Sequence, residues 1–211
     1  MTYIEKIAYH LGQRDEVPNK ELAALLAKEE NHKGIEEIAS YLEDRNTSIQ
    51  SDCIAVLYHI GYISPPLIAN YAGTFLKLLD SKTNRMVWGS MIALSTIAES
   101  VAEEIWQQRE KILGLIETGT VITNVSGVKT LINLSKAGGK YYDGLIDDLL
   151  RLQMDCRNVD FAKRAEDMWP AIGPAHRVAY KKILEERKPM LSNAAQKRLA
   201  KVMKNLAGEN S

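Results

Sequence analysis

Long hydrophobic runs are absent from this sequence, and no stretch approaches the roughly 20 consecutive apolar residues that a membrane-spanning helix requires. The first residues also lack a basic segment followed by an apolar one, the pattern of a signal peptide. Strand-forming patterns are scarce as well, since the one β-branched cluster, Thr118 to Val125, is short and interrupted by Gly119. We therefore expect a cytoplasmic, helical protein without a membrane segment.

Residues that form disulfides or ligate metals are few and scattered. Cys53 and Cys156 are far apart and form no CxxC pair, and both fall in apolar-periodic segments that predict buried, reduced thiols. The histidines show neither HExxH nor i,i+4 spacing; they are His10, His32, His59 and His176. The sequence predicts no metal site and no cofactor.

Motifs for catalysis are missing too. Gly-x-Ser-x-Gly does not occur, so no nucleophile elbow is predicted. The segment Ser135–Tyr141 contains Gly-Lys but has Leu134 where a phosphate loop needs glycine, and Tyr141 where it needs serine or threonine. A polar helix face accounts for the aspartates Asp143, Asp147 and Asp148. We expect a protein that is not an enzyme.

Apolar residues recur instead at three- and four-residue intervals, and glycine or proline interrupts them at short distances. Five segments end alike, at positions 37, 40, 35 and 35 residues apart: Gly61, Ala98, Gly138, Gly173 and Gly208. Eight residues before each end stands a small residue, which would let two helices approach closely: Cys53, Ser90, Thr130, Ala165 and Ala200. The final glycines suit helix stops in the left-handed conformation.

Each such helix follows another apolar one, which predicts a two-helix unit repeated five times. The first helices are expected at 35–44, 67–80, 102–117, 141–154 and 175–188. Two lead-in helices are expected near 2–11 and 19–31.

The chain resembles the HEAT-repeat family over about residues 34–208, most clearly in Ile49–Gly61, Phe75–Asp80 and Arg85–Ala98. The resemblance implies an all-α fold, an α-α superhelix or right-handed solenoid of about five HEAT-like helical hairpins. The predicted domains are an N-terminal helical pair (1–33), a repeat domain (34–208) and a disordered tail (209–211).

In such a solenoid the second helices line the concave face. We number each second helix backwards from its end residue (Gly61, Ala98, Gly138, Gly173 or Gly208), which is position zero. Positions −13, −10, −9, −6 and −3 then lie away from the apolar stripe that the pattern assigns to the core. The candidate binding residues on these positions are Asp52, Tyr58, Arg85, Trp88 and Lys129. Arg and Trp with Tyr nearby is a composition typical of interaction hot spots. We expect a protein or peptide partner on this face.

Nucleic-acid binding is the alternative. The net charge of zero hides an uneven distribution. Residues 1–150 contain 14 basic and 20 acidic residues, whereas residues 151–211 contain 13 basic and 7 acidic residues. The basic C-terminal repeats could follow phosphates or could be a solvated cap of the array. HEAT-like glycosylases that act on alkylated DNA use Trp, Asp and Arg, the residue types of Trp88, Asp52 and Arg85.

Overall fold

The computed structural model describes residues 2–208 and is helical, with no strand in that range. Its contacts divide the chain into two compact units, Met1–Thr130 and Leu131–Ser211. The predicted tail, 209–211, lies outside the described residues. The all-α prediction is confirmed.

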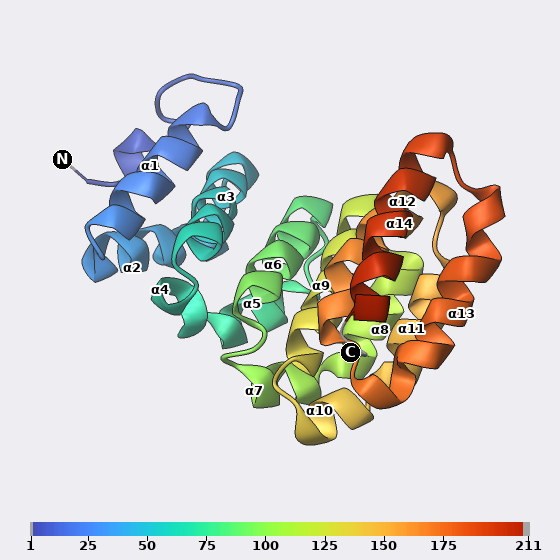
Figure 1. The fold of residues 1–211 in the computed structure, drawn as a ribbon. Helices are drawn as coiled ribbons and strands as arrows, with labels where there is room; N and C mark the ends of the chain where they lie inside the picture. The colour runs from blue at the N-terminus through green and yellow to red at the C-terminus, as the bar shows by residue number, and fades with distance from the viewer. Residues whose placement is uncertain (1, 209–211) are drawn as a thin grey trace. The chain divides into compact units, whose positions relative to one another are not determined.

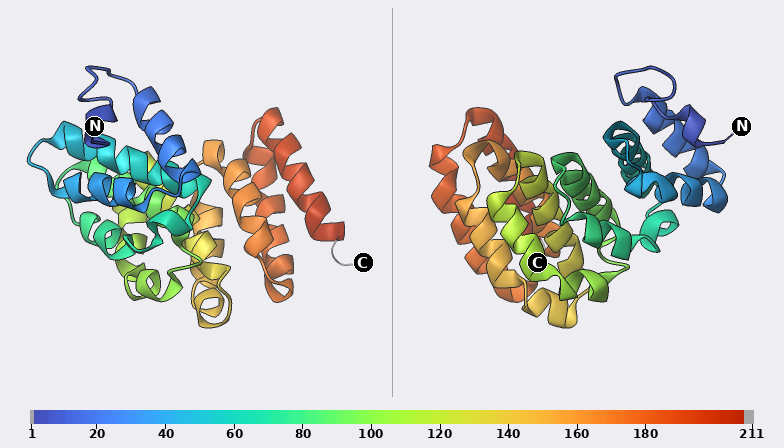
Figure 2. Two further views of the ribbon diagram at one scale, coloured as in Figure 1. Left: turned by 90° about the vertical axis from the view of Figure 1, so that its left-hand side faces the viewer. Right: turned by 180° about the vertical axis from the view of Figure 1, so that it is seen from behind.

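The N-terminal unit contains a row of helices that Figures 1 and 2 show from three sides. Their bounds are η1 Ile4–Lys6, α1 Val17–Lys28, α2 His32–Ser40, η2 Tyr41–Glu43, α3 Thr47–Ile63, α4 Pro66–Ala69, α5 Ala72–Leu78, α6 Asn84–Ile97, α7 Ala102–Gln107 and α8 Arg109–Thr118, with α9, Val121–Ser135, crossing into the next unit. Where a lead-in helix near 2–11 is predicted, the chain forms only the 3-10 turn η1 and further turns.

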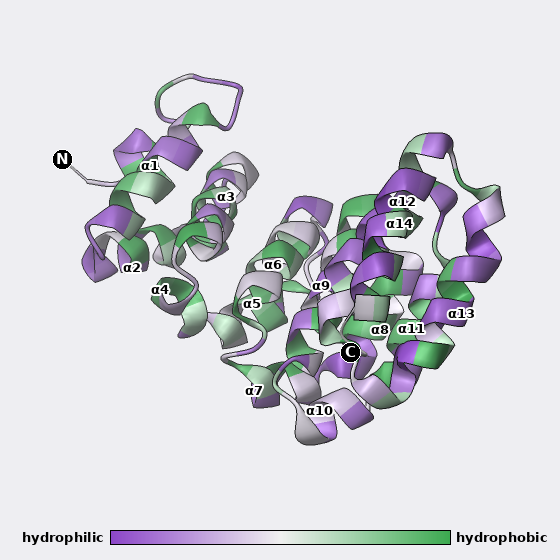
Figure 3. Cartoon of the chain, viewed as in Figure 1, coloured by the Kyte–Doolittle hydropathy of each residue, from purple (hydrophilic) through white to green (hydrophobic). Residues whose placement is uncertain are grey.

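The C-terminal unit repeats the pattern. Its elements are α10 Gly139–Asp143, α11 Ile146–Asp155, α12 Asn158–Met168, η3 Trp169–Ala171, η4 Pro174–His176, α13 Arg177–Arg187, η5 Lys188–Met190 and α14 Asn193–Gly208. α12 packs on α14 and α11 on α13, as equivalent helices of stacked hairpins do. Hydrophilic residues make up most of α13, whereas hydrophobic ones recur along α3 and α6 (Figure 3).

Most of the predicted first helices are interrupted at one equivalent residue, so that a repeat has three helices. The interrupting residues are Tyr71, Gln108 and Leu145, with φ of −97°, −109° and −115°. Each accepts a hydrogen bond at its backbone carbonyl from the amide four residues later, and so begins the next helix. Three helices per repeat is the armadillo variant of the HEAT-like plan.

The small residues of the predicted register are buried in four of five repeats. Cys53, Ser90, Thr130 and Ala165 are fully buried. Ala200 is exposed, because α14 buries the neighbouring stripe of Leu199, Val202 and Leu206 instead. The prediction is therefore correct for the first four repeats and wrong by one residue in the last.

The glycine stops are only partly as predicted. Gly138 has a positive φ of +75°, but its ψ of −170° is not that of a left-handed helix stop, and it lies between α9 and α10 as the N-cap of α10. Gly61 does not end its helix, because α3 continues to Ile63. A Cβ at Gly61 would lie 2.3 Å from Thr96 Oγ1, so this glycine permits close packing of α3 on α6.

The core-facing surface of α3 is wider than the sequence register predicts. α3 packs on α1 as well as on α6 and is enclosed from two sides. Positions −6 and −3, expected on the open face, are buried at Ala55 and Tyr58, and Ser95 is buried at position −3 of α6. On α3 and α6 the open face therefore retains mainly residues of positions −13 and −10 and those near the helix ends.

Candidate functional site

The candidate residues lie on α3, α6 and α9, the third helices of successive repeats. α3 and α6 pack side by side, and the Thr130 hydroxyl of α9 donates to the Met91 carbonyl of α6 at 3.3 Å. Figure 1 and the right-hand view of Figure 2 show the three helices following one another. Candidate residues 27 to 77 positions apart in sequence therefore lie on three successive helices.

Arg85 and Trp88 form the centre of this surface. Both lie in the first turns of α6, three residues apart, so their side chains share a helix face. The Arg85 guanidinium carbon lies 4.0 Å from the Trp88 ring centroid and 5.9 Å from that of Tyr58. This stacking holds the planar guanidinium against the ring and fixes the direction of its N–H groups. Trp88 is half-buried.

Glu16, which the sequence interpretation missed, is the acidic partner of this cluster. It precedes α1, and its Oε1 accepts a hydrogen bond from Arg85 Nη2 at 2.6 Å. Its Oε2 accepts one from the Tyr58 hydroxyl at 3.0 Å and lies 3.5 Å from His59 Nε2. Nothing in the residues around Glu16 indicates this role, because it depends on α1 packing against α3.

The cluster shifts the pKa of several of its groups. Burial alone would raise the pKa of Glu16, but hydrogen bonds and charge from Arg85, with the Tyr58 and His59 donors, lower it below its usual value. Burial lowers the pKa of His59 against the opposing effect of Glu16. Burial also raises the pKa of the Tyr58 phenol, so that it remains a hydrogen-bond donor at neutral pH.

Asp52 was predicted on the same face, but its carboxylate binds the N-terminal segment and not the Arg85 cluster. Its Oδ2 accepts a hydrogen bond from the Tyr9 backbone amide at 2.7 Å, and its Oδ1 accepts one from Asn19 Nδ2 at 2.8 Å. Asn19 is fully buried and in turn accepts from the Ala8 amide at 2.9 Å. Asp52 therefore anchors the N-terminal segment, and both of its oxygens are used within the fold.

Tyr62 and Lys129 extend the surface across α6. Tyr62, one residue beyond the repeat end on α3, is 53% exposed and was not among the predicted residues. Lys129 of α9 places its Nζ 5.5 Å from the Tyr62 ring centroid. Tyr62 also lies 6.2 Å from Tyr58, centroid to centroid. We call Tyr62, Arg85, Trp88 and Lys129 the α3/α6/α9 face.

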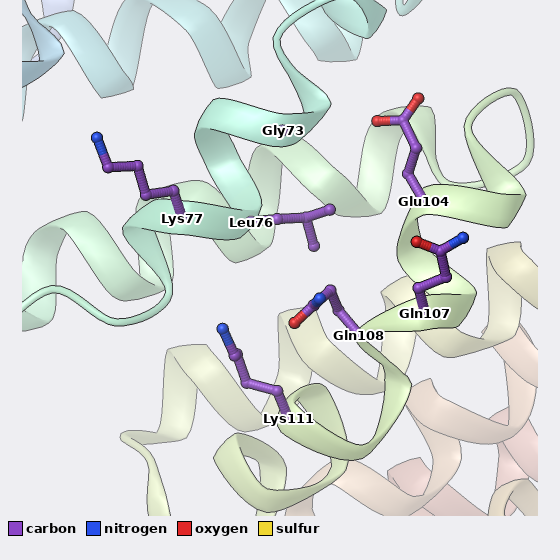
Figure 4. Close-up of a pocket in the computed structure, with 7 residues that line it drawn as sticks. All are labelled: Gly73, Leu76, Lys77, Glu104, Gln107, Gln108 and Lys111. Atoms are coloured by element: carbon purple, nitrogen blue, oxygen red, sulfur yellow. The ribbon is translucent and has the colours of Figure 1, made fainter.

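A separate open cleft lies among α5, α7 and α8 (Figure 4) and has a volume of about 340 Å³. It is lined by Gly73, Leu76, Lys77, Glu104, Gln107, Gln108 and Lys111. Lys77 pairs with Glu43 at 2.7 Å and Lys111 with Asp80 at 2.8 Å, so its cations link successive repeats. Across residues 2–208, no three metal-ligating side chains form a cluster.

Several basic side chains of the C-terminal unit are used within the fold. Arg187 donates to the backbone carbonyls of Met154 and Cys156, at the end of α11. Arg198 pairs with Glu166, and Lys181 with Glu185. These contacts reduce the cationic stripe that the nucleic-acid alternative requires. None of the helices in the described part of the chain is long and apolar enough to cross a membrane.

Similarity to known proteins lies in the fold. No family model and no curated protein matches this chain. Among solved structures it is similar to computationally designed armadillo repeat proteins for modular peptide recognition, with a TM-score of 0.64 at 13% identity over 96% of this chain and 97% of the other. A second designed armadillo repeat protein gives 0.65 at 12% identity, over 97% and 98%. An engineered protein from a structural genomics consortium gives 0.64 at 16% identity, over 99% and 98%.

These likenesses extend over nearly the whole chain and, at such low identity, concern the fold. The protein is an armadillo-like helical-repeat protein, which confirms the HEAT-like fold class predicted from the sequence.

Proposed function

We propose that this protein is a non-enzymatic scaffold that binds an extended peptide segment of another protein on the α3/α6/α9 face. The main observation in support is that three successive third helices place Tyr62, Arg85, Trp88 and Lys129 on one surface. Aromatic rings and a fixed guanidinium are the groups that dominate the binding free energy of protein interfaces.

The fold supports the proposal independently. Stacked repeats place equivalent helices side by side and so form an extended surface, which suits an elongated ligand better than a compact one. Among the similar structures, one group of designed armadillo repeat proteins was made for modular peptide recognition. Binding without catalysis also agrees with the sequence, which contains no nucleophile motif.

The test is selection of linear random peptides displayed on phage, followed by affinity measurement with the selected peptides in solution. Tyr62→Ala should weaken binding at least tenfold if this aromatic ring is a hot spot, which corresponds to about 1.4 kcal/mol or more. Val178→Ala is the matched control, because Val178 is an 82% exposed apolar residue on α13. Selected peptides that bind both variants as tightly as the parent would contradict the proposed surface.

A further inference from the structure

We propose that the α3/α6/α9 face recognises an acidic extended peptide, in which one carboxylate replaces Glu16 at Arg85 and a second, three residues away, pairs with Lys129. This inference rests on the proposed function and specifies the chemistry of the ligand.

The chain already holds a carboxylate at this place. Arg85, Tyr58 and His59 converge on the two oxygens of Glu16 with a geometry suited to a carboxylate. The Glu16 side chain is 36% exposed, and it follows an exposed segment that includes Gly12, whose φ is +67°. A ligand carboxylate can therefore approach from solvent and exchange with it.

The charges around the face favour an anionic ligand. Arg85 and Lys129 are cationic, and Lys20 is close enough to lower the pKa of His59. Among the carboxylates, Glu16 pairs with Arg85, and Asp52 accepts hydrogen bonds from the Tyr9 amide and Asn19. The Lys129 ammonium lies over the Tyr62 ring. Replacement of Glu16 leaves a cationic surface that attracts an anion.

Ring contacts connect the two cationic groups across the face. The Arg85 guanidinium carbon lies 5.9 Å from the Tyr58 ring centroid, Tyr58 lies 6.2 Å from Tyr62, centroid to centroid, and Lys129 Nζ lies 5.5 Å from the Tyr62 centroid. A polyproline II peptide rises about 3.1 Å per residue with three residues per turn, so residues i and i+3 point to the same side about 9 Å apart. A Glu-x-x-Glu pattern places both acids on one side of such a peptide.

The residues between the two acids would lie over Trp88 and Tyr62. Both rings are partly open to solvent, and Lys129 and Arg85 border them. Proline-containing segments dock onto aromatic surfaces of this kind, since they are already extended and lose little entropy on binding. The expected ligand is therefore a proline-containing acidic segment.

The experiment is calorimetric titration with the blocked peptide Ac-Pro-Glu-Pro-Pro-Glu-Pro-NH2 and its single and double Glu-to-Gln versions. A version with Lys in both Glu positions and a twelve-residue thymidine oligonucleotide are included. The proteins are the parent, Glu16→Gln, Arg85→Gln and Lys129→Ala, each checked for folding by circular dichroism.

The doubly acidic peptide should bind the parent most tightly. Glu16→Gln should tighten that binding about two- to sixfold, because a competing internal ion pair of ordinary surface strength is removed. Lys129→Ala should abolish the preference for Glu over Gln at one position only, and Arg85→Gln at the other. Should Arg85→Gln fail to fold, the Lys129→Ala and Glu16→Gln results still decide the matter.

The proposal is overturned if Glu16→Gln leaves acidic-peptide affinity unchanged or weakens it, or if the lysine peptide or the oligonucleotide binds more tightly. In those cases the phage-selected peptides still bind in a Tyr62-dependent way if the proposed function is correct. If the selected peptides also bind independently of Tyr62, the proposed function itself fails.

Discussion

The Glu16 carboxylate lies 2.6 Å from Arg85 Nη2 although the two residues are 69 positions apart. The pair joins the segment before α1 to the start of α6, while Tyr58 of α3 donates to the same carboxylate. One acidic side chain thus connects three layers of the N-terminal unit.

This pair predicts a pH dependence of stability. Because the folded-state pKa of Glu16 is below its ordinary value of 4.5, its contribution is fully present above that value and is lost as pH falls through the folded pKa. The other groups that face it are the Arg85 cation, the Tyr58 hydroxyl and His59, whose lowered pKa destabilises the fold in acid.

The melting temperature of Glu16→Gln should therefore be lower than that of the parent at pH 7, with the gap closing towards pH 3. Because Glu16 raises the pKa of His59, the substitution also changes the titration of His59, so the comparison is repeated with His59→Gln in both proteins to remove that contribution. A gap of the same size at pH 7 and pH 3 would show that the charge of Glu16 does not contribute.

Trp88→Ala should cost about 1–2 kcal/mol of unfolding free energy, less than the roughly 3–5 kcal/mol of a fully buried Trp, because the ring is only half-buried. Part of the loss comes from the Arg85 stacking contact. Urea denaturation measures it, with Trp88→Phe as the control that keeps an aromatic ring. A loss of about 3 kcal/mol or more would assign Trp88 to the core and not to a binding face.

The repeat pattern made most of the fold predictable, because the first four units each bury a small residue at the same register position. Cys53, Ser90, Thr130 and Ala165 are such residues. The last repeat departs from the pattern at Ala200, since its helix packs on one side only and can rotate to bury Leu199. The breaks at Tyr71 and Gln108 leave no sequence signal, because neither residue is a helix breaker.

The candidate site was only partly predictable. A periodic pattern places Arg85 and Trp88 on one helix face, since both belong to the same helix. It cannot place Glu16 or Tyr62, whose positions depend on how α1 and α3 pack. The pattern also cannot show that the Asp52 carboxylate accepts hydrogen bonds from the Tyr9 amide and from Asn19.

Asp52→Ala should loosen the N-terminal segment. The substitution leaves the buried Asn19 amide without its acceptor, and such a loss costs about 1–3 kcal/mol. Hydrogen exchange at the Tyr9 amide, whose hydrogen bond Asp52 accepts, should accelerate strongly, while exchange in α8 should not change. Equal protection of Tyr9 in both proteins would contradict the anchoring role.

The small residue of the repeat register offers a matched pair of substitutions. Ala165 is fully buried in α12, so Ala165→Leu should cost about 1–3 kcal/mol through overpacking. Ala200 occupies the equivalent register position in α14 but is exposed, so Ala200→Leu should change stability by less than about 0.5 kcal/mol. Thermal unfolding of the two variants compares them directly, and equal losses would contradict the one-residue shift in the last repeat.

The location of the binding surface is tested most directly by amide and indole chemical-shift mapping with a phage-selected peptide. We predict that the largest shifts fall on Tyr62, the Trp88 indole and Lys129, on three successive third helices. Shifts confined to the cleft lined by Gly73, Gln108 and Lys111, with the α3/α6/α9 face unperturbed, would contradict this location.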